Sequence, residues 1–419
     1  HADASALDDA YVGMELYLTG STGSGQRRTI TAYVGATRQC THAAWAVTPD
    51  TTTPYEVGAL SINVGGNKGA QYADPATSGK PEYVRIGEEI IRYTAKSGDT
   101  LSWSDTSYRA QFGTSRADHR ADDGVQLCRA FVDQSVSTVM KALLNESGIA
   151  DSYIDTAQLT SEDTAYLGVQ WHITACLSKP EQVSVLLGEL TQQTNSAMWW
   201  SAQTQEVEFK VLLPRLGTPV ELTDEANFVE DSVAVEPLDN LRLTRAAVYF
   251  EQRNATSNAK EAKNFYAGEL YADTDAESAD EYGDERPDVM YSRWFGADNR
   301  VAMHSLAARR LIHRRDAPKR VSFKVDPKDY TLPVGDQVDL YTRRLPGVDG
   351  NPEAVRAFVT KVLDRGAQIE IEARTTTFAK RYAFIAPNTA GSYPADSDYA
   401  HMADGSALMG DGSGAHLII

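Results

Sequence analysis

The chain has 419 residues, 42% of them hydrophobic, which allows about two to four folded domains and excludes a disordered scaffold. Its 58 acidic and 40 basic residues give a formal net charge of -18, which disfavours general binding to nucleic acid and to anionic lipid. No apolar run approaches the ~20 residues of a membrane-spanning helix, and the N-terminus lacks a signal-peptide pattern, so we expect no stable membrane binding.

The three cysteines, Cys40, Cys128 and Cys176, are odd in number and far apart. This spacing indicates neither a disulfide framework nor a CxxC metal site, and it favours buried free thiols. The chain begins at His1 instead of methionine, which suggests that the natural N-terminus lies elsewhere and leaves room for a preceding domain.

Two β segments are predicted first, a small β module over residues 1–57 and a second β segment over 58–132. Alternating apolar and polar residues, bounded by Gly and Ser, are typical of strands. Such strands are expected at Met14–Leu18, Thr29–Tyr33, Ala44–Val47, Leu60–Val64 and Tyr83–Tyr93, with a hairpin turn at Gly98–Asp99.

An α/β segment with two amphipathic helices is predicted over residues 133–200. The first helix begins after Asp133 or Ser135, ends at Gly148, and has an apolar stripe formed by Val136, Val139, Met140, Leu143 and Leu144. The second begins at Ser178 with Pro180 in its first turn, presents Val183, Leu186, Leu187 and Leu190 on one face, and leads into Met198–Trp200. Replacing Leu186 or Leu187 by Ala is expected to cost a few kcal/mol each, about the usual range for buried leucine.

Residues 201–317 are predicted to combine strands, an acidic loop and an Arg-rich helix. Strands are expected at Glu206–Leu213 and Leu241–Phe250, on either side of the acidic stretch Asp224–Pro237. A solvated acidic loop is expected from Asn254 to Pro287. The third helix, from about Asp298 to Arg315, is expected to turn Val301, Leu306, Leu311 and Ile312 inward.

A β-barrel-like domain or small sandwich is predicted over residues 318–386, followed by an extended C-terminal arm over 387–419. Its strands and turns are expected at Val321–Val325, Gly335–Asp336, Val338–Tyr341, Asp349–Gly350, Ala357–Leu363, Gly366 and Ile369–Ala373. The predicted fold class is therefore α+β and β-rich, with several small β-barrel or sandwich domains braced by a few amphipathic helices.

Three motifs have the residue types of a chemical site. Gly20–Gly25 has phosphate-loop glycine spacing, but Gln26 and Arg27 stand where Lys and Ser/Thr would be needed, so a hairpin turn is favoured. Asp273, Asp275 and Glu277 match the first ligand positions of a Ca²⁺ loop, but Ser278 replaces its glycine and Asp284 its last glutamate, so an acidic surface loop is favoured over a looser Ca²⁺ site.

Asp118 and His119, followed by Asp122 and Asp123, could supply a base and its orienting carboxylates, but no nucleophile accompanies them, and a polar hairpin end is favoured. His304 and His313 lie nine residues apart on one predicted helix, too far for one metal ion. No HExxH, GxSxG or paired Cys/His spacing occurs. We therefore expect no enzyme, no catalytic or metal site and no cofactor.

Two clusters leave alternatives open. Arg309, Arg310, Arg314 and Arg315, at the end of the third helix, either bind a phosphate or an acidic partner, or are solvated and pair with local carboxylates. The aromatic residues beside predicted element ends suit core packing and a subunit interface equally: Trp199, Trp200, Trp294 and Phe295.

Several stretches resemble tail proteins of long-tailed bacteriophages. Tyr83–Tyr93, Arg109–Thr114 and His119 are similar to a segment that recurs in them, and Gly23–Tyr33 with Gly35–Thr37 and Trp45 resembles a small β module of tail and appendage proteins. The run Val183–Val211 and the segment Arg293–Phe295 resemble central hub proteins of the tail tip, or baseplate.

The resemblance implies a virion protein, made in the bacterial host cytoplasm, that forms a ring-shaped hub, typically a homotrimer. Such a hub ends the tail tube, contacts distal tail, tape measure and tip or fibre proteins, and lets DNA pass as cargo. Three copies at -18 each would carry -54, and a lumen of that sign would let DNA slide past. The alternatives are a receptor- or glycan-binding tip module, using exposed aromatics around Trp45 and Tyr55, and, as the least favoured, a cell-wall hydrolase.

Overall fold

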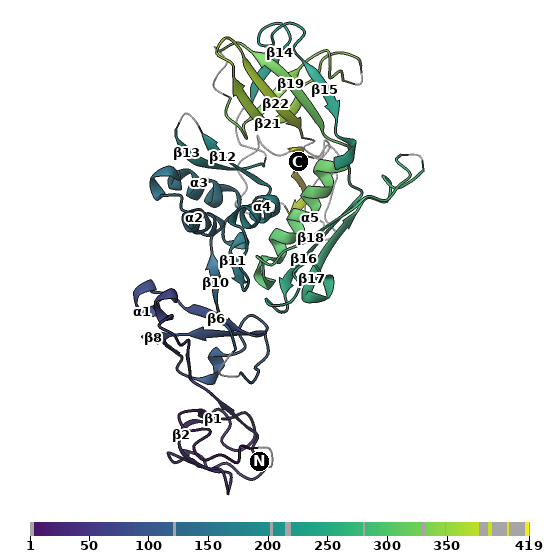
Figure 1. Ribbon diagram of the computed structural model, residues 1–419. Helices are drawn as coiled ribbons and strands as arrows, with labels where there is room; N and C mark the ends of the chain where they lie inside the picture. The colour runs from purple at the N-terminus through teal and green to yellow at the C-terminus, as the bar shows by residue number, and fades with distance from the viewer. Residues whose placement is uncertain are drawn as a thin grey trace. The chain divides into compact units, whose positions relative to one another are not determined.

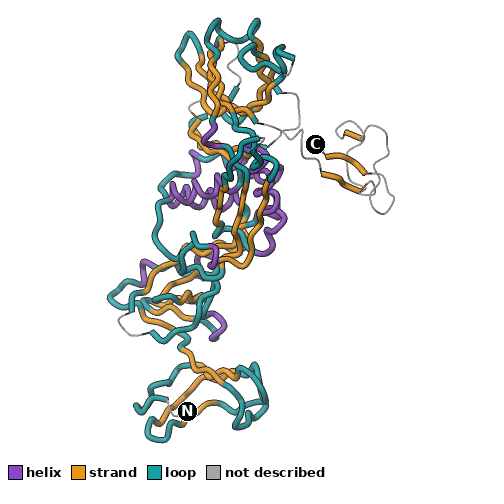
Figure 2. Tube along the Cα trace, turned by 90° about the vertical axis from the view of Figure 1, so that its right-hand side faces the viewer, coloured by secondary structure: helices purple, strands orange, loops and turns teal. Residues whose placement is uncertain are grey.

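The computed structural model describes residues 4–119, 123–201, 204–213, 219–279, 281–327, 332–347 and 349–376, and three short strands within 384–418 (Figure 1). The chain divides into two compact units. Unit 1 comprises His1–Asp133, Thr174–Glu181 and Gln252–Asn264, and unit 2 comprises Gln134–Ile173, Gln182–Glu251 and Phe265–Ile419. Both are rich in strands, and the helices of eight or more residues all lie in unit 2, as Figure 2 lets the reader follow, so the predicted α+β, β-rich fold class is confirmed.

The N-terminal sheet of unit 1 has the order β3-β2-β1-β4. Its strands are β1 (Glu15–Leu18), β2 (Arg27–Val34), β3 (Gln39–His42) and β4 (Tyr55–Gly58). The predicted strand at Ala44–Val47 is wrong, because the Gln26 side chain accepts hydrogen bonds from the backbone N–H groups of Ala46 and Val47 and donates to the Val47 carbonyl. A side chain, not a strand ladder, satisfies that backbone.

The rest of unit 1 contains two further sheets, ordered β5-β9-β8 and β11-β10-β6-β7. The elements are β5 (Ser61–Asn63), α1 (Pro75–Ser78), β6 (Glu82–Ile86), β7 (Glu89–Tyr93), β8 (Ala95–Ser97), β9 (Thr100–Ser102), β10 (Val125–Gln134) and β11 (Ile173–Leu177). The run Tyr83–Tyr93 is a hairpin that turns at Gly87, whose φ of +55° suits glycine. Val84 and Ile91 are buried on one face of this hairpin and Tyr83 and Ile90 on the other.

Helices and one hairpin form the first part of unit 2. The elements are α2 (Val136–Glu146), α3 (Thr156–Tyr166), α4 (Val183–Gln193), β12 (Ser196–Ser201) and β13 (Glu206–Val211). The prediction for α2 is confirmed: the Ser135 side chain caps its start, and all five residues of its apolar stripe are buried. Helix α4 begins at Val183 instead of Ser178, because the Ser178 hydroxyl is buried and donates to the carbonyl of Ala255.

Helix α3 was not predicted, so the segment 133–200 contains three helices of this size instead of two. Only Leu159 among its apolar residues is deeply buried, which leaves no apolar stripe to read in the sequence. Buried Glu162 and Asp163 secure it by accepting hydrogen bonds from the N–H groups of Val211 and Ser137. On α4, Leu186 is buried but Leu187 only partly, so the full cost expected for truncation to Ala applies to Leu186.

A three-stranded sheet, ordered β17-β16-β18, packs against α5 in unit 2. The elements are β16 (Arg245–Gln252), β17 (Phe265–Ala272), β18 (Pro287–Tyr291) and α5 (Arg300–Arg314). The prediction of a loop from Asn254 to Pro287 is wrong for β17, whose ladder with β16 fixes the backbone although its outward side chains stay exposed. Val301 is exposed instead of inward, because the buried side of α5 runs through Met303, Ala307 and Leu311.

The last described sheet has six strands in the order β14-β20-β21-β22-β19-β15. They are β14 (Val220–Thr223), β15 (Ala234–Pro237), β19 (Lys319–Val325), β20 (Gln337–Tyr341), β21 (Val355–Asp364) and β22 (Ile369–Thr375). The four strands predicted after residue 318 are confirmed, but the predicted barrel is not closed in the described residues, since β14 and β15 form the two edges. These edge strands come from the acidic stretch 224–237 and its flank, where strands were not expected.

The predicted C-terminal arm, 387–419, lies outside the described residues apart from short strands. These are β23 (Phe384–Pro387), β24 (Ala400–His401) and β25 (Ala415–Ile418), and β25 pairs antiparallel with both of the others. No described helix of either unit is long and apolar enough to span a membrane.

Candidate functional site

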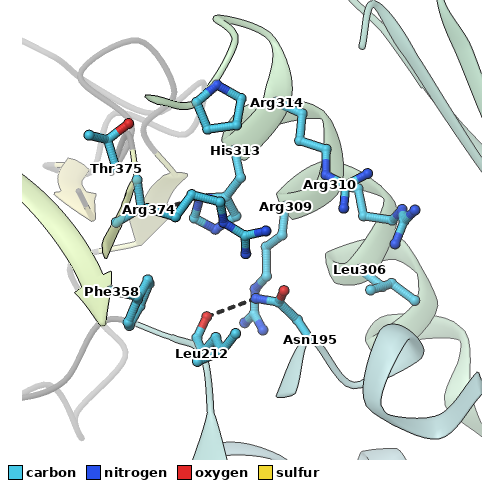
Figure 3. A pocket seen from close by; sticks show the side chains of 12 residues that line it. Asn195, Leu212, Leu306, Arg309, Arg310, His313, Arg314, Phe358, Arg374 and Thr375 are labelled. Atoms are coloured by element: carbon cyan, nitrogen blue, oxygen red, sulfur yellow. Dashed lines mark hydrogen bonds between the residues drawn. The ribbon is translucent and has the colours of Figure 1, made fainter. Parts of the chain in front are cut away.

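A basic cavity of about 50 Å³ lies in unit 2, between one face of α5 and the outer surface of the six-stranded sheet. We call it the arginine pocket and define it by Arg309, Arg314 and Arg374. Figure 3 shows Arg374 of β22 and Phe358 on one side of the pocket and the arginines of α5 on the other, with Arg310 and Arg314 lying side by side and extending away from Arg374.

Secondary-structure geometry explains why these residues meet. Positions 306, 309, 310, 313 and 314 recur at the spacing of one helical face, so α5 presents its basic residues together. In β22, Ala373 points into the core of the six-stranded sheet, and Arg374 must therefore point to the opposite face. The cavity is thus built from residues about sixty positions apart.

The arginines at the end of α5 divide into two groups, which resolves part of the alternative left open by the sequence. Arg310 pairs with Asp288, and Arg315 donates to Asp273 at 2.6 Å and to Asp316 at 2.6 Å. Arg309, Arg314 and Arg374 have no ion pair with a carboxylate in the part of the chain that the structure describes.

The unpaired guanidinium groups are partly withdrawn from solvent. Burial lowers the pKa of Arg309 and of Arg374. Burial and the neighbouring cations Arg310 and Arg374 lower the pKa of Arg314, although the nearby carboxylate of Asp288 acts in the opposite direction. All three stay protonated at neutral pH, because the guanidinium group loses its proton only in strongly alkaline solution. The pocket therefore concentrates positive charge, and none of these groups can act as a general base.

His313 completes the basic wall and is neutral at pH 7. Its Nδ1 lies 3.0 Å from the hydroxyl of Thr376. Burial, followed by the charges of Arg309, Arg374 and Arg314, lowers the pKa of His313 from 6.5 to about 4.

The low pKa of His313 predicts acid sensitivity of unit 2. Below pH 6.5 the unfolded chain binds a proton at this position that the folded chain does not take up until about pH 4. The stability contributed by neutral His313 is therefore complete above pH 6.5 and is lost as the pH falls towards 4, by about 3 kcal/mol in total.

Denaturant unfolding between pH 7 and pH 4 measures this loss. His313→Gln should remove that part of the pH dependence, whereas His304→Gln, which changes an exposed histidine of the same helix, should keep it. The same pH dependence in wild type and His313→Gln would contradict the assignment.

Three of the acidic residues considered for calcium, Asp273, Glu277 and Asp284, pair with arginines. Glu277 accepts from Arg245 at 2.7 and 2.8 Å, Asp284 pairs with Arg286, and Asp273 with Arg315. Hydrogen bonds from Arg245 lower the pKa of Glu277. Asp280 lies outside the described residues, and among the rest no group of three or more His, Cys, Asp or Glu could hold a metal ion.

The Gly20–Gly25 segment is the turn of the β1–β2 hairpin, as favoured from the sequence, with Gly23 and Gly25 at positive φ. Arg27, which follows it, donates to Glu15 at 2.8 Å and to the hydroxyl of Thr106 at 2.9 Å. Its guanidinium is engaged within unit 1.

His119 belongs to a buried structural cluster around Glu89 in unit 1, and Asp122 lies outside the described residues. The fully buried Glu89 carboxylate accepts from Arg109 at 2.9 and 2.6 Å, from His119 at 2.7 Å, and from the N–H groups of Ala110 and Ala117. These contacts tie the segment 109–119 to the β6–β7 hairpin. Glu89 and Arg109 were not singled out as site residues, although both lie in the stretches that carry the family resemblance.

The aromatic residues separate into core and surface. Trp294 and Phe295 are buried, with Phe295 edge-on to Trp171 at 5.6 Å, whereas Trp200 is 54% exposed. Trp45 is partly buried beneath the Arg28 guanidinium and beside His42, so it offers no open aromatic platform together with the exposed Tyr55.

Arg374 is the pocket residue that sequence reasoning missed. It stands at the end of a regular strand pattern, and only the packing of α5 on the outer sheet face gives it arginine neighbours. The four arginines of α5 were found because they are close in sequence.

Comparison with solved structures found low similarity. No family model matches the sequence, and no curated protein matches it. The virion of a native gene transfer agent particle contains a similar chain, at 15% identity and a TM-score of 0.39, over 58% of this chain. The match spans 48% of that chain, about half its length.

Two bacterial tail proteins are also similar. The 43 kDa tail protein of prophage MuSo2 from Shewanella oneidensis shows 12% identity and a TM-score of 0.33, covering 70% of this chain and 84% of that chain. A tail protein from Neisseria meningitidis MC58 shows 10% identity and a TM-score of 0.35, covering 71% and 96%. TM-scores below 0.5 assign neither a fold family nor a function.

Proposed function

We propose that the chain is a structural subunit of a phage tail and that it forms a ring-shaped hub of three copies. This hub connects the tail tube to tip or fibre proteins and lets DNA pass. The observation that carries an assembly role is an exposed apolar sheet face in unit 2. The resemblance of Tyr83–Tyr93, Arg109–Thr114 and Val183–Val211 to tail proteins supports the assignment of this assembly to a phage tail.

The apolar face is the side of the β17-β16-β18 sheet opposite α5. Tyr266 and Leu270 of β17 are 63% and 65% exposed, and Val289 of β18 is 45% exposed. Tyr249 of the central strand β16 and Tyr291 of β18 are stacked, with ring centroids 5.3 Å apart. Adjacent exposed apolar side chains mark interaction sites, because water contact with them is unfavourable.

The edges of the same sheet support this interpretation. β17 and β18 each have one strand neighbour among the described residues, so one side of each carries backbone groups that another chain can pair. A ring of identical subunits joins two different surfaces of each copy, and a strand edge beside an apolar face provides one of them.

The assembly role predicts self-association through this face. Light scattering of the full chain should give a mass about three times 45.8 kDa. The double variant Tyr266→Ser/Leu270→Ser should shift the protein towards the monomer, because truncating central apolar contacts of an interface costs about 1–4 kcal/mol each.

A matched control replaces two exposed valines elsewhere in unit 2. Val169 and Val185 are 81% and 49% exposed, and Val169→Ser/Val185→Ser should leave the mass unchanged. A wild-type mass of one subunit at micromolar concentration would contradict the assembly role.

A further inference from the structure

We propose that the arginine pocket binds a single oxyanion of the size of phosphate, held by the guanidinium groups of Arg309, Arg314 and Arg374. This site is independent of the proposed tail role, because it depends only on the charge, size and lining of one cavity in unit 2.

The first observation that supports anion binding is the uncompensated positive charge of the pocket. Three partly buried cations line the same small cavity, and the described residues supply none of them with a carboxylate ion pair. Arg310 and Arg374 repel the charge of Arg314, and such repulsion is stronger where water is excluded. An anion in the cavity would add an attractive interaction with each guanidinium and so offset this repulsion.

The donor geometry is the second reason. A guanidinium presents several N–H donors in a planar fork that fits two oxygens of a phosphate or carboxylate. Here such forks come from two elements that line the cavity, Arg309 and Arg314 from α5 and Arg374 from β22. Thr375 and Thr376 line the same cavity, with the Thr375 hydroxyl accepting from the Lys319 N–H and the Thr376 hydroxyl beside His313.

The size of the cavity selects the class of ligand. About 50 Å³ is room for about four water-sized oxygens, since one water requires roughly 10–15 Å³ by this measure. A phosphate group has four oxygens and so fits this volume, whereas a strand of nucleic acid needs a continuous groove. Leu212, Leu306 and Phe358 form apolar parts of the lining, which strengthens the attraction between opposite charges.

The dipole of α5 opposes anion binding, but its charge is smaller than that of the arginines. The pocket lies towards the C-terminal end of α5, where the helix dipole places about half an elementary negative charge. Three full positive charges outweigh it, and Arg310, also at the pocket, is already paired with Asp288.

Calorimetry and thermal unfolding of the full chain test the site, with sodium phosphate compared with sodium chloride at equal ionic strength and pH 7. Phosphate should bind saturably and, at about 100 times its Kd, raise the Tm of unit 2 by about 5–10 °C above the chloride value. Arg374→Met and Arg309→Met, one from each of the two elements, should each weaken phosphate binding at least about ten-fold.

Arg300→Met is the matched control, because Arg300 lies on the same helix with a side chain 74% exposed, and it should bind phosphate like wild type. In chloride alone the pocket variants should be at least as stable as wild type, since each removes a repelling charge, whereas a merely structural arginine would lower the Tm when replaced. A bound anion should also raise the pKa of His313 in wild type, measurable by NMR even if one variant does not fold.

A parallel titration with sodium acetate identifies the source of the oxyanion. Tighter binding of phosphate than of acetate assigns the site to a phosphate group, and tighter binding of acetate, lost in the same variants, assigns it to a carboxylate. Equal Tm values in phosphate, acetate and chloride, or undiminished binding by both pocket variants, would overturn the proposal.

Discussion

Replacing Glu89 by Gln is expected to destabilise unit 1 by about 3–5 kcal/mol, the usual cost of breaking a buried ion pair by removing one partner. The Glu89 carboxylate is completely buried, and the side chain of Arg109, which donates two hydrogen bonds to it, is only 12% exposed. The glutamine amide keeps the shape of the side chain but leaves the charge of Arg109 uncompensated. The NH₂ group of the glutamine also faces hydrogen-bond donors at a position where an acceptor is needed.

Denaturant unfolding of wild type and Glu89→Gln measures this loss, and Glu88→Gln is the control. Glu88 is the neighbouring residue, and its side chain is 72% exposed while it pairs with Arg85, so its replacement should cost less than about 1 kcal/mol. Equal costs at the two positions would show that the buried cluster does not hold the segment 109–119 to its hairpin.

The pKa of Glu89 adds a pH dependence with a definite sign. Burial raises it, but the hydrogen bonds from Arg109, the Ala117 N–H and His119 outweigh burial and leave the folded pKa below the usual value. The ionised form therefore stabilises unit 1 above about pH 4.5, and this contribution is lost as the pH falls through the lower folded value. Glu89→Gln should lack that part of the acid sensitivity.

Replacing Trp294 by Ala is expected to destabilise unit 2 by about 3–5 kcal/mol, the range for truncating a buried large aromatic residue. Trp294 has no exposed surface, and its indole N–H donates to Glu189 at 3.1 Å. Glu189 also accepts hydrogen bonds from Arg293. Trp294→Ala therefore leaves a cavity in the core and also removes one of the hydrogen-bond donors to the Glu189 carboxylate.

Trp200→Ala is the comparison for Trp294→Ala, since Trp200 is 54% exposed and contacts Tyr153 at the surface. Its replacement should cost about 1 kcal/mol or less in thermal or denaturant unfolding of the isolated chain. If both variants lost the same stability, the division of these aromatics into core and surface would be wrong.

Local periodicity predicted the elements whose stability is local. Helix α2 combines a capping residue, Ser135, with a complete apolar stripe, and the strands β19 to β22 alternate regularly between Gly-containing turns. Their type and approximate bounds could therefore be predicted from neighbouring residues alone.

Elements held by distant partners could not be predicted. Helix α3 depends on the buried carboxylates Glu162 and Asp163, and β17 depends on its ladder with β16. In both elements the sequence pattern indicates polar, solvated side chains, because the groups that form hydrogen bonds with them or cover them lie far away in the sequence.

The candidate site shows the same limit. The arginines of α5 were evident as a cluster, but nothing near them in the sequence distinguishes Arg310 and Arg315, which find carboxylates, from Arg309 and Arg314, which do not. Arg374 joins them only because β22 turns it outward beneath α5. A sequence pattern indicated basic character here, and tertiary packing determined which charges remain uncompensated.

Electron microscopy of the purified full chain tests the proposed hub most directly. If exposed sheet faces join copies of this chain, particles should be closed rings with a central channel, and Tyr266→Ser/Leu270→Ser should yield single subunits. Single 45.8 kDa particles from wild-type protein, at concentrations where light scattering detects no larger species, would contradict the assembly on which the tail role rests.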